Sequence, residues 1–159
     1  ADELKHALKE FKGNRRRFQY RIDEPDFCLI DDYAHHPEEI RSMLVSLRQM
    51  YKERKITVVF QPHLYTRTRD FADEFAEVLS LADRVLLLDI YPARELPIEG
   101  VTSEMLLSKI CKANASLTSN KKLFEDIMKC PLDVLVMMGA GNIDAMVGQI
   151  EKEIRNVKS

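Results

Sequence analysis

Short runs of apolar residues alternate along this chain with longer stretches in which apolar residues recur every three or four positions. An uninterrupted apolar run is typical of a strand that is covered on both faces. Four runs of this kind occupy residues 27–30, 56–60, 85–90 and 134–138, and Thr57 and Asp89 are the polar residues within them. Residues 17–22 alternate between polar and apolar side chains, which predicts a further strand, and residues 115–118 predict a minor one.

Apolar stripes with helical spacing lie between these segments and predict amphipathic helices that pack on a sheet. The stripe after Pro37 consists of Ile40, Met43, Leu44, Leu47 and Tyr51, the next of Phe71, Phe75, Val78, Leu79 and Ala82, and the last of Ile143, Met146, Val147, Ile150 and Ile154. Shorter helices are expected at residues 4–11, 103–111 and 121–128.

Strands that alternate with helices through short loops favour a mostly parallel sheet, because a crossover helix usually connects two parallel strands. The sequence therefore predicts an α/β fold, a three-layer Rossmann-like domain with helices on both faces of the sheet. Right-handed crossovers usually bring successive strands side by side. The loops after the strands at 27–30 and 56–60 are therefore expected to share one edge of the sheet.

Composition narrows the possible functions. The 159 residues suffice for one domain with its own core, and 45% hydrophobic with 31% charged residues is typical of a globular chain. The net charge of -2 argues against nucleic-acid binding, since no basic face dominates. No apolar run approaches the roughly 18 residues of a membrane span, so we expect no membrane insertion and a cytoplasmic location.

Two further features concern thiols and phosphates. Cys28, Cys111 and Cys130 stand far apart without metal-ligand spacing, and we expect buried, unpaired thiols in a reducing compartment. The chain also lacks the Gly-x-x-x-x-Gly-Lys-Ser/Thr loop that cradles nucleotide phosphates. A chain without this loop is not expected to be a complete ATP-using enzyme.

Side chains that can bind a ligand or transfer a proton are most concentrated at residues 31–37. This run reads Asp-Asp-Tyr-Ala-His-His-Pro and joins a predicted strand to a predicted helix. Proline suits the first helical position, where no backbone N–H is needed. Such a junction at the carboxyl end of a strand is where open α/β sheets bind ligands. His63 and Arg67 follow the next predicted strand, so we expect them on the same rim as His35 and His36.

Metal binding and anion binding are alternative uses of this rim. Adjacent side chains such as those of His35 and His36 diverge and rarely hold one ion together, and no His-x-x-x-His spacing is present, so no metal site is predicted. Arg67 stands where a loop opens a helix and offers a planar fork to a carboxylate or a phosphate. On the residues alone, the role of Arg17 at a strand start stays open.

Five segments, in the same order, resemble the C-terminal domain of the Mur ligase family. They are Arg16-Arg17-Phe18, the run at residues 31–37, the run at residues 60–68 that reads Phe-Gln-Pro-His-Leu-Tyr-Thr-Arg-Thr, Asp89-Ile90-Tyr91-Pro92-Ala93-Arg94-Glu95, and Gly139-Ala140-Gly141-Asn142-Ile143. The matches cover most of the chain, from about Phe11 to Ile143. Their common order identifies the chain as a member of this family more strongly than any single match.

Mur ligases join an amino acid to a UDP-linked muramic acid through an acyl phosphate made from ATP, and they divide this task among three domains. The resemblance implies that residues 1–12 are the tail of the preceding central domain or a linker helix, and that residues 13–159 form the amino-acid-binding C-terminal domain. It also implies a reaction that adds L-alanine to UDP-N-acetylmuramate in peptidoglycan precursor synthesis.

The same resemblance implies cofactors and partners. ATP and Mg2+ would serve the full-length enzyme, whereas this domain alone would be inactive and would hold neither tightly. The partners would be L-alanine, UDP-N-acetylmuramate and ATP, together with the N-terminal and central domains.

Residue roles follow from the matched motifs. The nucleotide contacts are expected from Arg17 and Asp32, and the alanine contacts from Tyr33, His35, His63 and Arg67. His35 and His63 are candidates for orienting the amine, and Arg67 for holding the carboxylate. Leu64 departs from the family pattern, because Arg is common at this position.

Two other functions stay open at this point. A related recycling ligase attaches a tripeptide to the same muramic acid and shares the Asp-Asp-x-Ala-His-His-Pro run. Its next strand usually ends in Pro-Arg, so Gln61-Pro62-His63 favours the alanine-adding reaction. A stand-alone binding module for amino acids or nucleotides is the other alternative. A Gly-x-x-Gly-Lys-Thr loop upstream in the full-length protein would identify it as a ligase.

Overall fold

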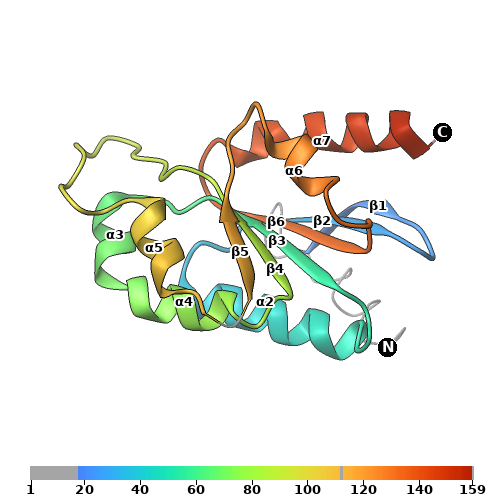
Figure 1. Cartoon of the computed structure of the whole chain (residues 1–159), viewed down its shortest axis with the longest axis horizontal. Helices are drawn as coiled ribbons and strands as arrows, with labels where there is room; N and C mark the ends of the chain where they lie inside the picture. Colours follow the sequence, from blue (N-terminus) through green and yellow to red (C-terminus); the bar gives the residue numbers. More distant parts are fainter. Residues whose placement is uncertain (1–17, 112, 159) are drawn as a thin grey trace.

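A sheet with helices on both sides forms the body of the computed structural model, which describes residues 18–111 and 113–158 (Figure 1). The strands are β1 (Gln19–Asp23), β2 (Cys28–Asp32), β3 (Ile56–Phe60), β4 (Arg84–Leu87), β5 (Asn114–Leu117) and β6 (Val134–Met138). The helices are α2 (Pro37–Met50), α3 (Tyr65–Asp70), α4 (Ala72–Leu79), α5 (Ser103–Lys109), α6 (Leu123–Ile127) and α7 (Ile143–Lys158).

The sheet has the strand order β1-β2-β6-β3-β4-β5. β1 pairs antiparallel with β2, and every other neighbouring pair is parallel, which confirms the predicted mostly parallel sheet. The expectation that successive strands are neighbours is wrong for β2 and β3. β6 lies between them, because the chain returns from the far edge through α6 and enters the middle of the sheet.

Two apolar cores lie on opposite faces of this sheet and confirm the three-layer architecture. Side chains alternate between the faces along each strand, so Val58 and Phe60 of β3 enter one core and Val59 enters the other. The first core packs under α2, α4 and α5, where Phe75 is fully buried. The second packs under α6 and α7, where Val147 is fully buried. Figure 1 shows the two helix layers on either side of the strands.

The helical stripe that begins at Phe71 needs one correction. Phe75, Val78, Leu79 and Ala82 are buried as predicted, but Phe71 is 36% exposed. It stands at the break between α3 and α4, where its backbone leaves the helical region with φ -118° and ψ 21°. The break rotates Phe71 off the apolar face of α4, which the continuous spacing in the sequence did not reveal.

The cysteines also differ from the expectation. Cys28 is buried, whereas Cys111 is exposed and Cys130 is half-buried. No disulfide bond joins any two of these three cysteines. Only the Cys28 thiol therefore belongs to the core, on the β2 face that packs under α2.

Several predictions fall outside the part of the chain that the structure describes. They are the helix at residues 4–11, the tail at residues 1–12 and the nucleotide contact of Arg17. Across residues 18–111 and 113–158, no helix has both the length and the apolar character that a membrane crossing requires.

Candidate functional site

The carboxylate of Asp32 holds the loop that follows β2. Its Oδ1 accepts a hydrogen bond from the backbone N–H of Phe18 at 2.6 Å, and its Oδ2 accepts one from the N–H of Ala34 at 2.9 Å. Asp32 is only 6% exposed, and charge-assisted hydrogen bonds are strong where water is excluded. The bond to Ala34 closes an Asx turn that directs the chain from the sheet toward α2.

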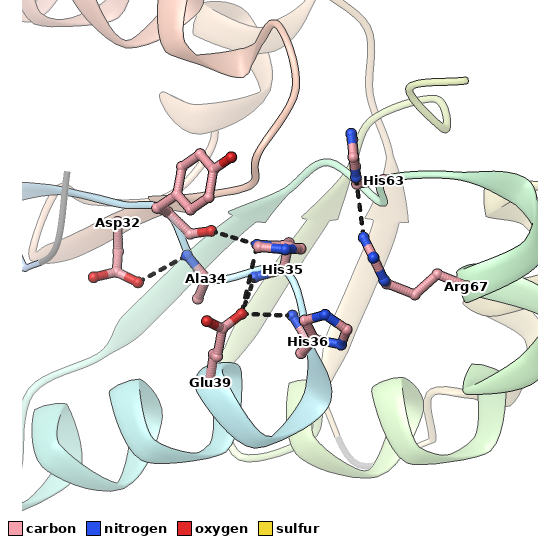
Figure 2. Close-up of polar contacts among 8 residues, drawn as sticks. Asp32, Ala34, His35, His36, Glu39, His63 and Arg67 are labelled. Atoms are coloured by element: carbon pink, nitrogen blue, oxygen red, sulfur yellow. Dashed lines mark hydrogen bonds and ion pairs between the residues drawn. The ribbon is translucent and has the colours of Figure 1, made fainter. Parts of the chain in front are cut away.

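The start of α2 fixes the two adjacent histidines. His36 is the N-cap and Pro37 takes the first helical position, as predicted. Oε1 of Glu39 accepts the backbone N–H of His35 at 3.2 Å and that of His36 at 3.0 Å (Figure 2). A glutamate at this third helical position commonly satisfies the free N–H groups of a helix start. The histidine backbones are therefore held by the helix itself.

The loop that follows β3 is held by the loop after β4. Leu64 donates its N–H to the carbonyl of Tyr91 at 2.8 Å, and Tyr91 donates its N–H to the carbonyl of Pro62 at 2.8 Å. The rings of His63 and Tyr91 stack with a centroid distance of 5.7 Å and an interplanar angle of 11°. Leu64 has a φ of 73°, a conformation that residues other than glycine seldom adopt. These contacts fix His63 on the rim.

The loop after β6 closes the site from the other side. The side chain of Gln61 spans the gap, because its Nε2 donates to Oδ1 of Asn142 at 2.5 Å and its Oε1 accepts the N–H of Ile143 at 3.0 Å. A Cβ at Gly141 would lie 2.6 Å from both Gln61 Oε1 and Tyr91 Cγ. The segment Gly139-Ala140-Gly141 is thus a tight strand-to-helix turn that packs directly on Gln61 and Tyr91.

The structure brings the four residues predicted to bind alanine onto one rim. The ring of Tyr33 lies 5.1 Å from that of His35, and the ring of His35 lies 5.9 Å from that of His63, centroid to centroid. Nη1 of Arg67 lies 3.0 Å from Nδ1 of His63 (Figure 2). The shared rim exists although β6 separates β2 from β3, because both loops leave the carboxyl ends of parallel strands.

Arg67 keeps most of its hydrogen-bonding capacity. In the described part of the chain its guanidinium contacts His63 and forms no ion pair with a carboxylate, whereas the neighbouring Arg69 pairs with Asp70 at 2.9 Å on the surface. Asp70 and Glu74 follow Arg67 along the chain and could pair with it on the surface, but no such ion pair is present among the described residues. A fixed cation with unused N–H donors at a rim can bind an anionic ligand group.

Asp32 has a different position from the four rim residues. Both of its carboxylate oxygens already accept backbone hydrogen bonds, so it has a structural role in the loop. Its contact with a nucleotide stays a prediction. Arg17, the other expected nucleotide contact, lies outside the described residues.

Burial and the charge of Arg67 favour the neutral form of two imidazoles on the rim, those of His63 and His36. Burial, followed by the charge of Arg67 and by His35, lowers the pKa of His63 below its ordinary value, and Glu95 opposes this only in part. Burial and the Arg67 charge likewise lower the pKa of His36. A neutral imidazole can accept a proton or a hydrogen bond, so the rim favours these functions of histidine over that of a fixed charge.

We expect the free energy of unfolding to fall in mild acid. The unfolded chain protonates an imidazole near pH 6.5, at about the ordinary pKa, whereas folded His63 takes up its proton only at lower pH. The stabilisation is therefore complete above that pH and is lost as the pH falls through the folded pKa. Urea unfolding across the range from about pH 8 to about pH 5 measures it. His63→Gln should flatten this dependence, and an unchanged slope would contradict the assignment.

Sequence reasoning did not single out several residues that build the site. Glu39 is one of two acidic residues in the first turn of α2, and this position alone does not predict a contact with the His35 ring. Gln61 and Tyr91 were quoted within motifs, but their contacts across loops could not be read from one segment alone. Tyr91 also lines a cleft of about 400 Å³, together with Gln61, Asn142 and Lys121.

Metal ligation is not evident at the rim. Among residues 18–111 and 113–158, no group of three or more His, Cys, Asp or Glu side chains is arranged to hold an ion. The side chains of His35 and His63 instead direct Nδ1 to protein partners.

Comparison with known proteins identifies the family of the chain. The family model described as Mur ligase, glutamate ligase domain, matches residues 16–141. A UDP-N-acetylmuramate–L-alanine ligase from Christiangramia forsetii is 52% identical over 152 residues, which are 96% of this chain and 34% of the relative. The chain thus spans about a third of the length of the curated relatives it matches.

Solved structures share the fold. The crystal structure of a UDP-N-acetylmuramate–alanine ligase from Thermotoga maritima matches with a TM-score of 0.74 and 28% identity, over 96% of this chain and 33% of that one. A murein peptide ligase from Psychrobacter arcticus matches with a TM-score of 0.70 and 22% identity, over 92% of this chain and 31% of that one. The second match shows a similar fold only.

Proposed function

The chain belongs to the Mur ligase family, of which it carries the glutamate ligase domain, and from this premise we propose that it is the amino-acid-binding domain of an ATP-dependent ligase. The proposed reaction joins L-alanine to UDP-N-acetylmuramate in peptidoglycan precursor synthesis. Residues 13–159 would form this domain, and residues 1–12 would lead in from a central domain. A reaction on a nucleotide-linked sugar with ATP would take place in the cytoplasm.

The observation that supports this proposal best is the presence of Arg67, in contact with His63, and of a second imidazole, that of His35, on one rim. An α-amino acid carries a carboxylate and an amine close together, so its site needs a cation beside proton acceptors. Arg67 is such a cation, since no carboxylate pairs with it in the described part of the chain, and His63 lies 3.0 Å from it. His35 follows at a ring distance of 5.9 Å from His63.

The chemistry of amide ligation requires what this rim can offer. The amine must lose its proton before it attacks an acyl phosphate, and positioned imidazoles can accept protons near neutral pH. The carboxylate must be held so that the amine points at the acyl carbon, and a guanidinium can bind a carboxylate with two parallel hydrogen bonds. Orientation of this kind accounts for a large part of the rate in such transfers.

ATP and Mg2+ belong to the proposed full-length enzyme and would supply the activated acyl phosphate. The described residues lack both a metal-ligating group of three and a phosphate-cradling loop. We therefore propose that the central domain holds most of the nucleotide and the metal. Asp32 and Arg17 would contribute contacts from this domain.

The division of labour between domains gives a direct test. The isolated chain should release no ADP from ATP in the presence of L-alanine and UDP-N-acetylmuramate, because the P-loop is missing. The full-length protein, with an upstream P-loop, should release ADP only when both substrates are present. A coupled ADP assay measures both, with the isolated domain at the same molar concentration. Alanine-dependent ADP release by the isolated chain would overturn the proposed division.

A further inference from the structure

The two imidazoles that face each other on the rim have opposite hydrogen-bonding environments. Nδ1 of His35 lies 3.0 Å from the carbonyl oxygen of Tyr33 and 3.5 Å from Oε1 of Glu39 (Figure 2). A carbonyl and a carboxylate can only accept. Nδ1 of His35 must therefore carry a hydrogen, and in the neutral ring Nε2 has the free lone pair.

His63 has the reverse arrangement. Its Nδ1 lies 3.0 Å from Nη1 of Arg67, and a guanidinium can only donate. Nδ1 of His63 must therefore hold the lone pair, and the hydrogen of the neutral ring lies on Nε2. Burial and the Arg67 charge lower the pKa of His63, which agrees with a neutral ring.

We propose that His35 and His63 hold opposite neutral tautomers, so that Nε2 of His35 is the base for the incoming amine and Nε2–H of His63 donates a hydrogen bond to a substrate oxygen. Glu39 is then a positioning residue, whose carboxylate adds to the nearer Tyr33 carbonyl in favouring the Nδ1–H tautomer of His35. This inference rests on the proposed function for its chemistry, but the tautomers themselves follow from the geometry alone.

The proton balance of the step is simple. The ammonium group of the amino acid gives one proton to Nε2 of His35, which leaves a neutral amine and an imidazolium. The amine lone pair forms the bond to the acyl carbon, and the carbon–oxygen bond to phosphate breaks with its electrons on the phosphate. The attacking nitrogen loses its second proton to the departing phosphate, and His35 returns its own proton to solvent.

Glu39 is well placed for the positioning role. Its Oε1 accepts the backbone N–H groups of His35 and His36, so the helix start holds the carboxylate beside the His35 ring. A carboxylate at Nδ1 orients an imidazole and stabilises the imidazolium that forms when Nε2 accepts a proton. Glu38, its neighbour, is 84% exposed in its side chain and pairs only weakly with Arg41 at 3.9 Å, so it offers a matched control.

Nitrogen-15 NMR of this chain tests the tautomers directly. At about pH 8.5, where histidine with its ordinary pKa is neutral, His35 should show the Nδ1–H form and His63 the Nε2–H form. Glu39→Gln should lower the Nδ1–H population of His35, whereas Glu38→Gln should leave it unchanged. Glutamine also serves a helix start at this position, so the variant should fold. The same tautomer at both histidines in the wild-type chain would overturn the proposal.

Kinetics of the full-length protein test the catalytic part. Glu39→Gln should lower kcat by about tenfold, a fraction of the 10²–10⁴-fold typical of general-base catalysis, with little change in KM for ATP. Glu38→Gln should keep wild-type kcat. Equal kcat in the two variants would overturn the role of Glu39. A full-length protein that ligates no L-alanine would overturn the proposed function and this catalytic role, while the NMR result would still decide the tautomers.

Discussion

Arg67→Lys is expected to lower kcat/KM for L-alanine by about ten- to a hundredfold in the full-length protein. An ammonium cannot reproduce the two-pronged contact of a guanidinium with a carboxylate. Losing one charge-assisted hydrogen bond in a closed site costs roughly 1.5–3 kcal/mol, which corresponds to this range of rates. Steady-state kinetics with varied L-alanine and saturating ATP measure the effect, and KM for ATP should change much less.

Arg69→Lys is the matched control for this experiment. Arg69 lies two positions further along α3 and pairs with Asp70 on the exposed surface, where an ion pair contributes only about 0–1 kcal/mol. Its kinetic constants should stay close to those of the wild type. Small and equal effects at both positions would mean that Arg67 is ordinary surface charge and that the substrate assignment is wrong.

Asp32→Ala is expected to lower the free energy of unfolding by about 3–5 kcal/mol, because two backbone N–H groups lose a charged acceptor. Phe18 and Ala34 donate these hydrogen bonds to a carboxylate that is almost fully buried. Urea unfolding of the chain, followed by circular dichroism, measures the loss as a lower midpoint. The same substitution should weaken the use of ATP by the full-length protein if Asp32 also contacts the nucleotide.

Asp70→Ala provides the control for stability. Its carboxylate is exposed and pairs with Arg69 on the surface, so the loss should stay within about 1 kcal/mol. A similar midpoint for both aspartate variants would show that the hydrogen bonds of Asp32 do not hold the loop. Normal stability with impaired ATP kinetics would instead assign Asp32 to the nucleotide alone.

The strands and the main helices could be predicted because their signals are local. An apolar run or a helical stripe can be recognised within one short segment of the sequence. It predicts the burial of side chains such as Phe60 and Val147, which are fully buried. The insertion of β6 between β2 and β3 could not be predicted, because strand order depends on pairing between segments far apart in the chain. The break at Phe71 was also hidden, since the spacing of apolar residues continues through it.

The candidate site likewise has features that the local sequence predicts and features that depend on contacts between distant segments. Tyr33, His35, His63 and Arg67 could be placed on one rim because each follows a strand end, where parallel strands place their loops together. The contacts that orient these side chains could not be predicted. The carboxylate of Glu39 at Nδ1 of His35 and the guanidinium of Arg67 at Nδ1 of His63 depend on rotamers that only the folded chain sets.

The choice of amino-group donor tests the central claim most directly. The measurement is kcat/KM of the full-length protein for L-alanine and for the tripeptide that a recycling ligase would use, each with saturating ATP and UDP-N-acetylmuramate. We predict that L-alanine is strongly preferred, in agreement with the 52% identity to a UDP-N-acetylmuramate–L-alanine ligase. A preference for the tripeptide, or no ligation of either donor, would contradict the assignment of this domain to L-alanine.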